Sequence, residues 1–204
     1  MTNAPLQTPR GSKILADPAH MAANSNEPTL DEDGNPLTTE SLLKTAEAHL
    51  IKQDPRFKGL IDAHHCRIFS PEGLAERIDP FQSLVSGICG QQVSSAAATS
   101  IRNKFIGLFD EDGVFPAPEQ VAKTDIAHLR TAGLSGRKAE YIQGLAKKFV
   151  KEELTATMLA NASDAEVLEK LVAVRGLGRW SVEMFACFGL KRMDIFSTGD
   201  LGVQ

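Results

Sequence analysis

Residues 171–204 read LVAVRGLGRWSVEMFACFGLKRMDIFSTGDLGVQ, and two glycines near the start of this stretch decide the fold class. Gly176 and Gly178 flank one apolar residue, Leu177, between an apolar-periodic segment that ends before them and another that begins at Ser181. Because glycine permits backbone turns and close approaches that other residues do not, this spacing predicts a tight helix–hairpin–helix corner filled by Leu177. Its bare backbone would let a phosphate reach the amides that open the second helix. The alternative is an ordinary helix–loop–helix corner, which a lone GxG pattern favours.

The composition is that of a globular protein and excludes several classes. The chain has 204 residues, 42% of them hydrophobic and 24% charged, which excludes collagen, a coiled coil and full disorder. No run of about 18 apolar residues predicts a membrane-spanning helix, and the first residues lack the apolar core of a secretory signal, so we expect no membrane partner. Three cysteines, Cys66, Cys89 and Cys187, form no CxxC pair and indicate free thiols in a reducing, intracellular compartment.

The charge is unevenly distributed along the chain. The formal net charge is −4, which excludes a protein that binds nucleic acid through overall basicity. Residues 171–192 nevertheless hold four cations and one anion. A local basic surface of this kind is sufficient to bind phosphates.

The pattern of apolar residues and caps predicts an all-α fold, a bundle of short helices. Residues 1–37 have little periodicity and few apolar residues, so we expect a disordered N-terminal tail, followed by a helical domain over 38–204. The expected helices are residues 41–52, one that opens at Pro80 after Asp79 and stops at Gly90, residues 94–109, one capped by Ser135, and one opened by a capping box, Ser163 with Glu166. No segment shows the alternation of a β-strand.

Three segments together resemble the helix–hairpin–helix DNA glycosylase superfamily that carries a Gly-Pro-Asp-rich motif. They are LVSGICGQQVSSAAATSIR at 84–102, AGLSGRKAEYIQGLAKKF at 132–149, and the hairpin with Asp200 placed 22 residues beyond Gly178. They occur in the family's order and cover roughly residues 80–204. The branch they resemble most is the monofunctional alkylbase type, 3-methyladenine DNA glycosylase II, and especially its fungal members.

This resemblance implies an enzyme of base excision DNA repair. It would hydrolyse the N-glycosidic bond of alkylated purines, of the 3-methyladenine type, in double-stranded DNA after flipping the base out of the duplex. The resemblance gives Asp200 the catalytic role of stabilising the cationic sugar, and Trp180 a place in the base pocket, where it would stack on a cationic purine. In members that also cleave the strand, a lysine stands where this chain has Trp180, so we expect base removal without strand cleavage.

The same resemblance places further residues at the DNA. Gln91 and Gln92 stand at the junction where the family carries its intercalating wedge, a role we give to Gln92; the alternative is a pair of glutamines that cap a helix end. The hairpin amides of Gly176, Gly178 and Ser181 would take a phosphate. The resemblance requires no cofactor, and allows a structural monovalent cation, Na⁺ or K⁺, on the backbone carbonyls of Val172, Val174 and Gly176. It also implies a monomer in the nucleus.

The chain departs from the family pattern at its end. It stops four residues after Asp200, whereas family members continue with further helices, so we expect missing C-terminal helices and no helix whose amides hold the Asp200 side chain. Met184 stands where some members place a pocket aromatic residue. A second hypothesis is therefore a non-catalytic helix–hairpin–helix DNA-binding fragment. A third, an unrelated helical interaction protein, would not depend on the hairpin glycines.

Overall fold

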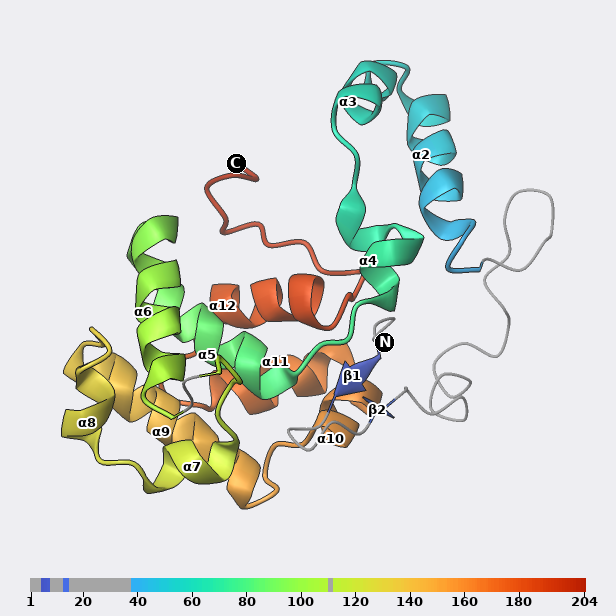
Figure 1. Ribbon diagram of the computed structural model, residues 1–204. Helices are drawn as coiled ribbons and strands as arrows, with labels where there is room; N and C mark the ends of the chain where they lie inside the picture. Colours follow the sequence, from blue (N-terminus) through green and yellow to red (C-terminus); the bar gives the residue numbers. More distant parts are fainter. Residues whose placement is uncertain (1–4, 8–12, 15–37, 110–111) are drawn as a thin grey trace.

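The computed structural model describes residues 5–7, 13–14, 38–109 and 112–204, and short helices dominate it (Figure 1). The helices and helical turns, in chain order, are α2 Leu42–Gln53, α3 Phe57–Ala63, the 3₁₀ turn Arg67–Phe69, α4 Pro71–Ala75, α5 Pro80–Gly90, α6 Ser95–Gly107, α7 Pro118–Lys123, α8 Ile126–Arg130, α9 Gly136–Val150, α10 Ala156–Asn161, α11 Asp164–Val172, α12 Arg179–Met184 and the π-helical turn Phe185–Gly189. The all-α prediction is confirmed. Within the described ranges, no helix combines the length and the apolar character needed to cross a membrane.

Side-chain hydrogen bonds cap four of the predicted helix starts. Asp79, Ser94, Ser135 and Ser163 each accept a hydrogen bond from the amide three residues ahead, at 3.0 to 3.3 Å. The Glu166 carboxylate accepts a bond in return from the Ser163 amide at 2.8 Å, which completes the capping box. Each cap satisfies a backbone donor that the helix itself leaves unpaired, so these four helices begin where the sequence predicts.

The core lies where α5 and α9 pack together, with α6, α7 and α8 against them (Figure 1). The apolar faces of both helices are buried, among them Ile88 of α5 and Ile142 of α9. Aromatic rings close one end of this core. Phe81 meets Phe115 edge to face at 6.2 Å, and Phe105 lies 5.8 Å from the same ring.

Two short strands stand outside the predicted pattern. β1 (Leu6–Gln7) and β2 (Lys13–Ile14) form an antiparallel pair, and the Gln7 amide donates to the Ile78 carbonyl at 2.7 Å. Leu6 is fully buried in the main core. The predicted disordered tail over 1–37 lies mostly outside the described residues. At residues 5–7 the chain is instead part of the folded body, because Leu6 supplies apolar surface that the core encloses.

The helix predicted over 41–52 forms as α2, but the apolar stripe on it is not buried. Neither α2 nor α3 contains a buried residue, and Leu50 of α2 is 42% exposed. In Figure 1 the two helices stand apart from the other helices. Periodicity alone therefore predicted the helix and not its burial.

A buried arginine fixes the segment that follows α12. The side chain of Arg192 is 1% exposed, and its Nη1 lies 2.6 Å from the Asp164 carboxylate. Its Nη2 donates to the carbonyls of Leu159 and Ala162 at 3.1 and 2.7 Å, at the C-terminal end of α10. Because a buried guanidinium is costly without partners, these three contacts hold residues 190–193 firmly against α10 and α11.

Candidate nucleic-acid and base-binding site

The hairpin between α11 and α12 has the predicted tight geometry. Leu177 is buried between the two helices, and its amide donates to the Val174 carbonyl at 3.0 Å. Gly176 has φ +96°, and a Cβ there would lie 2.8 Å from the Cβ of Tyr141 and nearer still to two of its ring carbons. Gly178 has an ordinary φ of −83° and no atom within 4 Å of a Cβ position. Backbone conformation and packing therefore require glycine at position 176. Position 178 has neither constraint and lies at an open surface.

The start of α12 offers unpaired backbone amides at this open surface. Gly178 is the N-cap and has no side chain, and no described side chain caps the helix. The first amides of a helix have no acceptor within the helix, so they and the helix dipole favour an anion. Arg175 and Arg179 flank the hairpin with side chains that are 75% and 74% exposed.

The junction after α5 is tied to the hairpin by a polar contact. Gln91 is half-buried, and its Nε2 donates to the Gly176 carbonyl at 2.8 Å across 85 residues of sequence. Lys138 of α9 donates its Nζ to the carbonyls of Cys89 and Gln91 at 2.9 and 2.8 Å. Gln92 follows with φ +53° and an exposed side chain. The Gln91 side chain thus bonds to the protein itself, and Gln92 is the one of the pair that reaches solvent.

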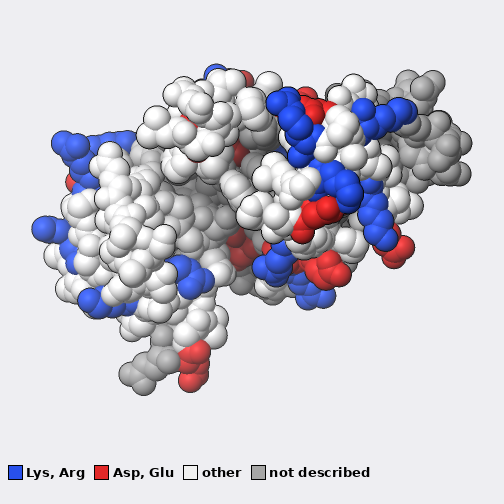
Figure 2. Space-filling model, turned by 90° about the horizontal axis from the view of Figure 1, so that it is seen from above, with Lys and Arg blue, Asp and Glu red and all other residues white. Residues whose placement is uncertain are grey.

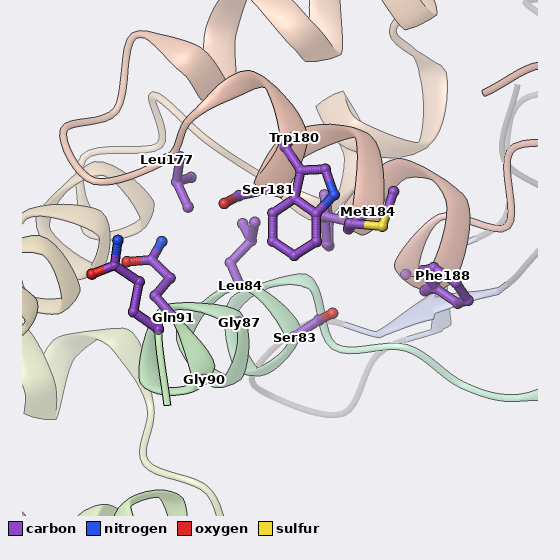
Figure 3. A pocket seen from close by; sticks show the side chains of 13 residues that line it. Ser83, Leu84, Gly87, Gly90, Gln91, Leu177, Trp180, Ser181, Met184 and Phe188 are labelled. Carbon is purple, nitrogen blue, oxygen red and sulfur yellow. The ribbon is translucent and has the colours of Figure 1, made fainter. Parts of the chain in front are cut away.

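A pocket of about 340 Å³ lies between α5 and α12 (Figure 3). It is lined by Ser83, Leu84, Gly87, Gly90, Gln91, Gln92, Leu177, Trp180, Ser181, Met184, Phe185, Phe188 and Gly189. No carboxylate or basic side chain is among these residues, so the described lining is mostly apolar. Pockets of about 300 to 1,000 Å³ with such a lining are typical small-molecule sites.

Trp180 and Asp200 meet at the edge of this pocket. The indole Nε1 donates to the Asp200 Oδ2 at 2.5 Å, and the Gly202 amide donates to Oδ1 at 2.7 Å. The bond from Trp180, then that from Gly202, lowers the pKa of Asp200 below its ordinary value of 3.8, because both favour the ionised carboxylate. The Trp180 ring remains 51% exposed and lines the pocket (Figure 3). An ionised carboxylate and an electron-rich ring are therefore held side by side.

No helix follows Asp200 among the described residues, as expected from the sequence, but the chain turns back toward its side chain. The amides of Val203 and Gln204 donate to the Asp200 carbonyl at 3.1 and 3.2 Å, so a single turn follows it. That turn brings the Gly202 amide to the carboxylate. The side chain is thus held by an amide without a full helix, because one turn is enough to point a donor at it.

Two of the three carbonyls predicted to hold a monovalent cation accept hydrogen bonds from within the protein. The Val174 and Gly176 oxygens each accept one hydrogen bond, from the Leu177 amide and from Gln91. A carbonyl oxygen has two lone pairs, so one remains on each for a cation. Carbonyl oxygens suit Na⁺ or K⁺ chemically. The cation site stays a prediction.

Several pocket residues escaped the sequence analysis. Ser83 and Gly87 are small residues one helical turn apart on α5, and both line the pocket below Trp180 (Figure 3). Two small residues one turn apart indicate that this face of the helix leaves space for another group. Phe188 is 58% exposed and closes the far end. It lies in the π-helical turn, which apolar periodicity did not reveal.

Charged side chains border a hollow on the face that Figure 2 shows. Lys and Arg lie on both sides of the hollow, with Asp and Glu intermixed mostly on one side, and the surface between them is largely uncharged. The local basic surface predicted from four cations in residues 171–192 was wrong in part: Lys191 and Arg192 are buried. Arg175 and Arg179 are exposed, and each pairs with a glutamate, Glu140 and Glu183.

Comparison with known proteins gives consistent matches. The model of the HhH-GPD superfamily base excision DNA repair protein family matches residues 85–204. DNA-3-methyladenine glycosylase 1 of Schizosaccharomyces pombe is 31% identical over 177 residues, which are 86% of this chain and 76% of that protein. The DNA-3-methyladenine glycosylase of Saccharomyces cerevisiae is 32% identical over 80% of this chain and 58% of its own length.

Solved structures agree with these matches. A DNA-3-methyladenine glycosidase from Bacillus halodurans superposes with a TM-score of 0.56 and 42% identity, over 60% of this chain and 56% of that one. The S. pombe 3-methyladenine DNA glycosylase in complex with abasic DNA gives a TM-score of 0.55 and 32% identity, over 60% and 59%. This chain therefore spans a little over half of each of these solved chains. The family match over residues 85–204 contains the hairpin, Asp200 and all of the pocket lining except Ser83 and Leu84. The chain belongs to the HhH-GPD superfamily of base excision DNA repair proteins.

Proposed function

We propose that this protein is a monofunctional DNA glycosylase that removes alkylated purines of the 3-methyladenine type from double-stranded DNA. The observation that carries the proposal is the contact between Trp180 and Asp200 at the edge of an apolar pocket. The names of its relatives, DNA-3-methyladenine glycosylases from two yeasts, support it.

The pair suits the chemistry of a cationic leaving group. An alkylated purine carries positive charge, and stacking on the exposed Trp180 ring would stabilise it by about 0.5 to 2 kcal/mol through cation–π attraction. As the glycosidic bond breaks, positive charge develops on the sugar, and the ionised Asp200 carboxylate stabilises it. The pocket lining has no acidic side chain to protonate a neutral base, so a base that is already cationic fits it best.

Strand cleavage would need an amine at C1′ to form a Schiff base. By the family resemblance, Trp180 stands where strand-cleaving members carry the lysine that supplies this amine. An indole nitrogen, already donating to Asp200, does not act as such a nucleophile. The reaction therefore ends at an abasic site.

The hairpin and the junction would hold the DNA. The amides at Gly178 and Ser181 bind a backbone phosphate, and a monovalent cation on the Val172, Val174 and Gly176 carbonyls would add positive charge there. The exposed Gln92 side chain fills the space that the flipped base leaves in the duplex.

The test is release of 3-methyladenine from alkylated duplex DNA by this chain and by its Asp200→Asn variant. We expect release by the first, at least about 100-fold slower release by the second, and strand breaks only after heat or alkali. Binding to a duplex with an abasic-site analogue, measured by fluorescence anisotropy, should be kept by Asp200→Asn and lost in Gly178→Asp. Binding without release would refute the enzyme and leave a DNA-binding fragment. Binding that tolerates Gly178→Asp would refute the hairpin interface.

A further inference from the structure

A second side-chain pair attaches the segment before Asp200 to α12. Ser197 is 4% exposed, and its Oγ donates to the Oε2 of Glu183 at 2.6 Å. The other oxygen of Glu183, Oε1, accepts from the Arg179 Nε at 2.8 Å. Both carboxylate oxygens of the largely buried Glu183 side chain therefore accept a hydrogen bond. One bond comes from Arg179 within α12, and the other comes from Ser197 in the segment before Asp200.

The two attachments form a closed ring of contacts. Trp180 and Glu183 lie three residues apart on α12, so their side chains leave the helix on neighbouring sides. Trp180 bonds to Asp200, and Glu183 bonds to Ser197. The Asp200 amide donates to the Ser197 carbonyl at 3.1 Å, which closes the ring with one turn. Ser197 is thus the buried end of the turn, and Asp200 is its half-buried end.

We propose that Glu183 is a positioning residue, which holds Ser197 and, through the turn that starts there, sets the Asp200 carboxylate against the Trp180 indole. Its effect on catalysis rests on the proposed function, whereas the placement of Asp200 does not.

The direction of the hydrogen bond makes Glu183 suited to this role. The bond from Ser197 lowers the pKa of Glu183, and Arg179 acts in the same direction, so the carboxylate is ionised near neutral pH. An ionised carboxylate only accepts, so the hydroxyl of Ser197 must donate, and its rotation is fixed. Without this bond, the contact between Trp180 and Asp200 is the one side-chain hydrogen bond between described residues that would still join this turn to α12.

The chain contains a built-in reporter of this geometry. Trp180 is the only tryptophan, so a ¹⁵N–¹H correlation spectrum shows a single indole N–H resonance. Its position depends on the hydrogen bond to Asp200, and the variant Asp200→Asn defines the position when that bond is altered. We expect Ser197→Ala and Glu183→Ala to move the resonance toward that of Asp200→Asn. Glu183→Gln, which keeps an acceptor oxygen for Ser197, should leave it near the position in the unaltered chain.

A matched control removes a carboxylate without touching the ring of contacts. Glu169 is an exposed residue of α11, and Glu169→Ala should leave the resonance in place. The proposal is overturned if Ser197→Ala leaves the indole resonance unmoved while Asp200→Asn shifts it. It is also overturned if Asp200→Asn produces no shift, because the contact to be positioned would then be absent.

Kinetics tests the consequence for the reaction. Displacement of a catalytic group by about 1 Å costs up to about 100-fold in rate, so we expect single-turnover base release by Ser197→Ala to fall by about 10- to 100-fold. Affinity for a duplex with an abasic-site analogue should change by less than about twofold, since the hairpin is untouched. A moved resonance with an unchanged rate would overturn the positioning role. If the unaltered chain releases no base, the proposed function fails, and the spectra still decide whether Glu183 places Asp200.

Discussion

The two hairpin glycines should respond very differently to the same added methyl group. In Gly176→Ala the Cβ meets Tyr141 at 2.8 Å or less, and the residue must keep φ at +96°. An L-residue in this left-handed region costs about 1 kcal/mol relative to glycine. Overpacking adds about 1 to 3 kcal/mol. We therefore expect a loss of about 2 to 4 kcal/mol in the free energy of unfolding.

Gly178→Ala is the matched comparison. Its φ of −83° is ordinary, and a Cβ there meets nothing within 4 Å, so we expect a change within about 0.5 kcal/mol. At about 2 to 4 °C per kcal/mol for a chain of this size, Gly176→Ala should melt about 4 to 16 °C below Gly178→Ala.

The assay is urea and thermal unfolding followed by far-ultraviolet circular dichroism, with all variants in one buffer. In a Tyr141→Ala background, which removes the two nearest atoms and keeps only the Cβ at 2.8 Å, Gly176→Ala should recover much of the overpacking part of its loss and keep the backbone part. Equal stability of the two alanine variants would refute this explanation of the hairpin, because it would mean that neither the ring of Tyr141 nor the positive φ constrains position 176.

Three further outcomes are expected. Arg192→Ala should lower the free energy of unfolding by about 3 to 5 kcal/mol in urea titrations, because it leaves Asp164 and two carbonyls without their partner; a loss below about 1 kcal/mol would contradict this. Lys138→Met should cost about 2 to 4 kcal/mol, since two carbonyls lose a charged donor, while Lys138→Arg should recover part of it. The pKa values of Glu183 and Asp200 lie below the ordinary values of 4.5 and 3.8. Each ionised carboxylate therefore adds to the free energy of unfolding. This contribution is fully present at pH values above the ordinary pKa and is lost as the pH falls through the lowered pKa. Urea midpoints measured from pH 6 downward should therefore fall below about pH 4.5, and less steeply in Glu183→Gln; an equal slope would count against the shift in Glu183.

The local structure of the central helices was predictable because their signals are local. Asp79 with Pro80, and Ser163 with Glu166, carry their cap geometry in adjacent residues, and each helix begins where these residues place it. The burial of a helix is decided elsewhere in the chain. The stripe that includes Leu50 has ordinary helical spacing, yet none of its residues is fully buried, so the spacing predicted the helix but not the burial of its apolar face.

In the candidate site, too, the sequence identified individual residues but not the contacts between them. Trp180 and Asp200 were identified by resemblance, and Trp180 lines the pocket. Nothing in their separation of 20 residues predicts that the indole donates to the carboxylate. The role of Gln91 depends on a partner 85 residues away, the Gly176 carbonyl, which no local pattern reveals. Ser197 appeared to be one polar residue among several, and only its burial against Glu183 distinguishes it.

The burial of Leu6 has a consequence for the order in which the fold is completed during synthesis. Leu6 leaves the ribosome well before its neighbours in the core, which are Ile78 and helix α10, ending at Asn161. The segment around Leu6 must therefore wait until the chain has been made through α10 before its site in the core exists. Contacts of such long range slow folding, and meanwhile an apolar segment stays open to other chains. A nascent chain stalled before α10 should for this reason be more readily cleaved by protease near Leu6 than one stalled after it.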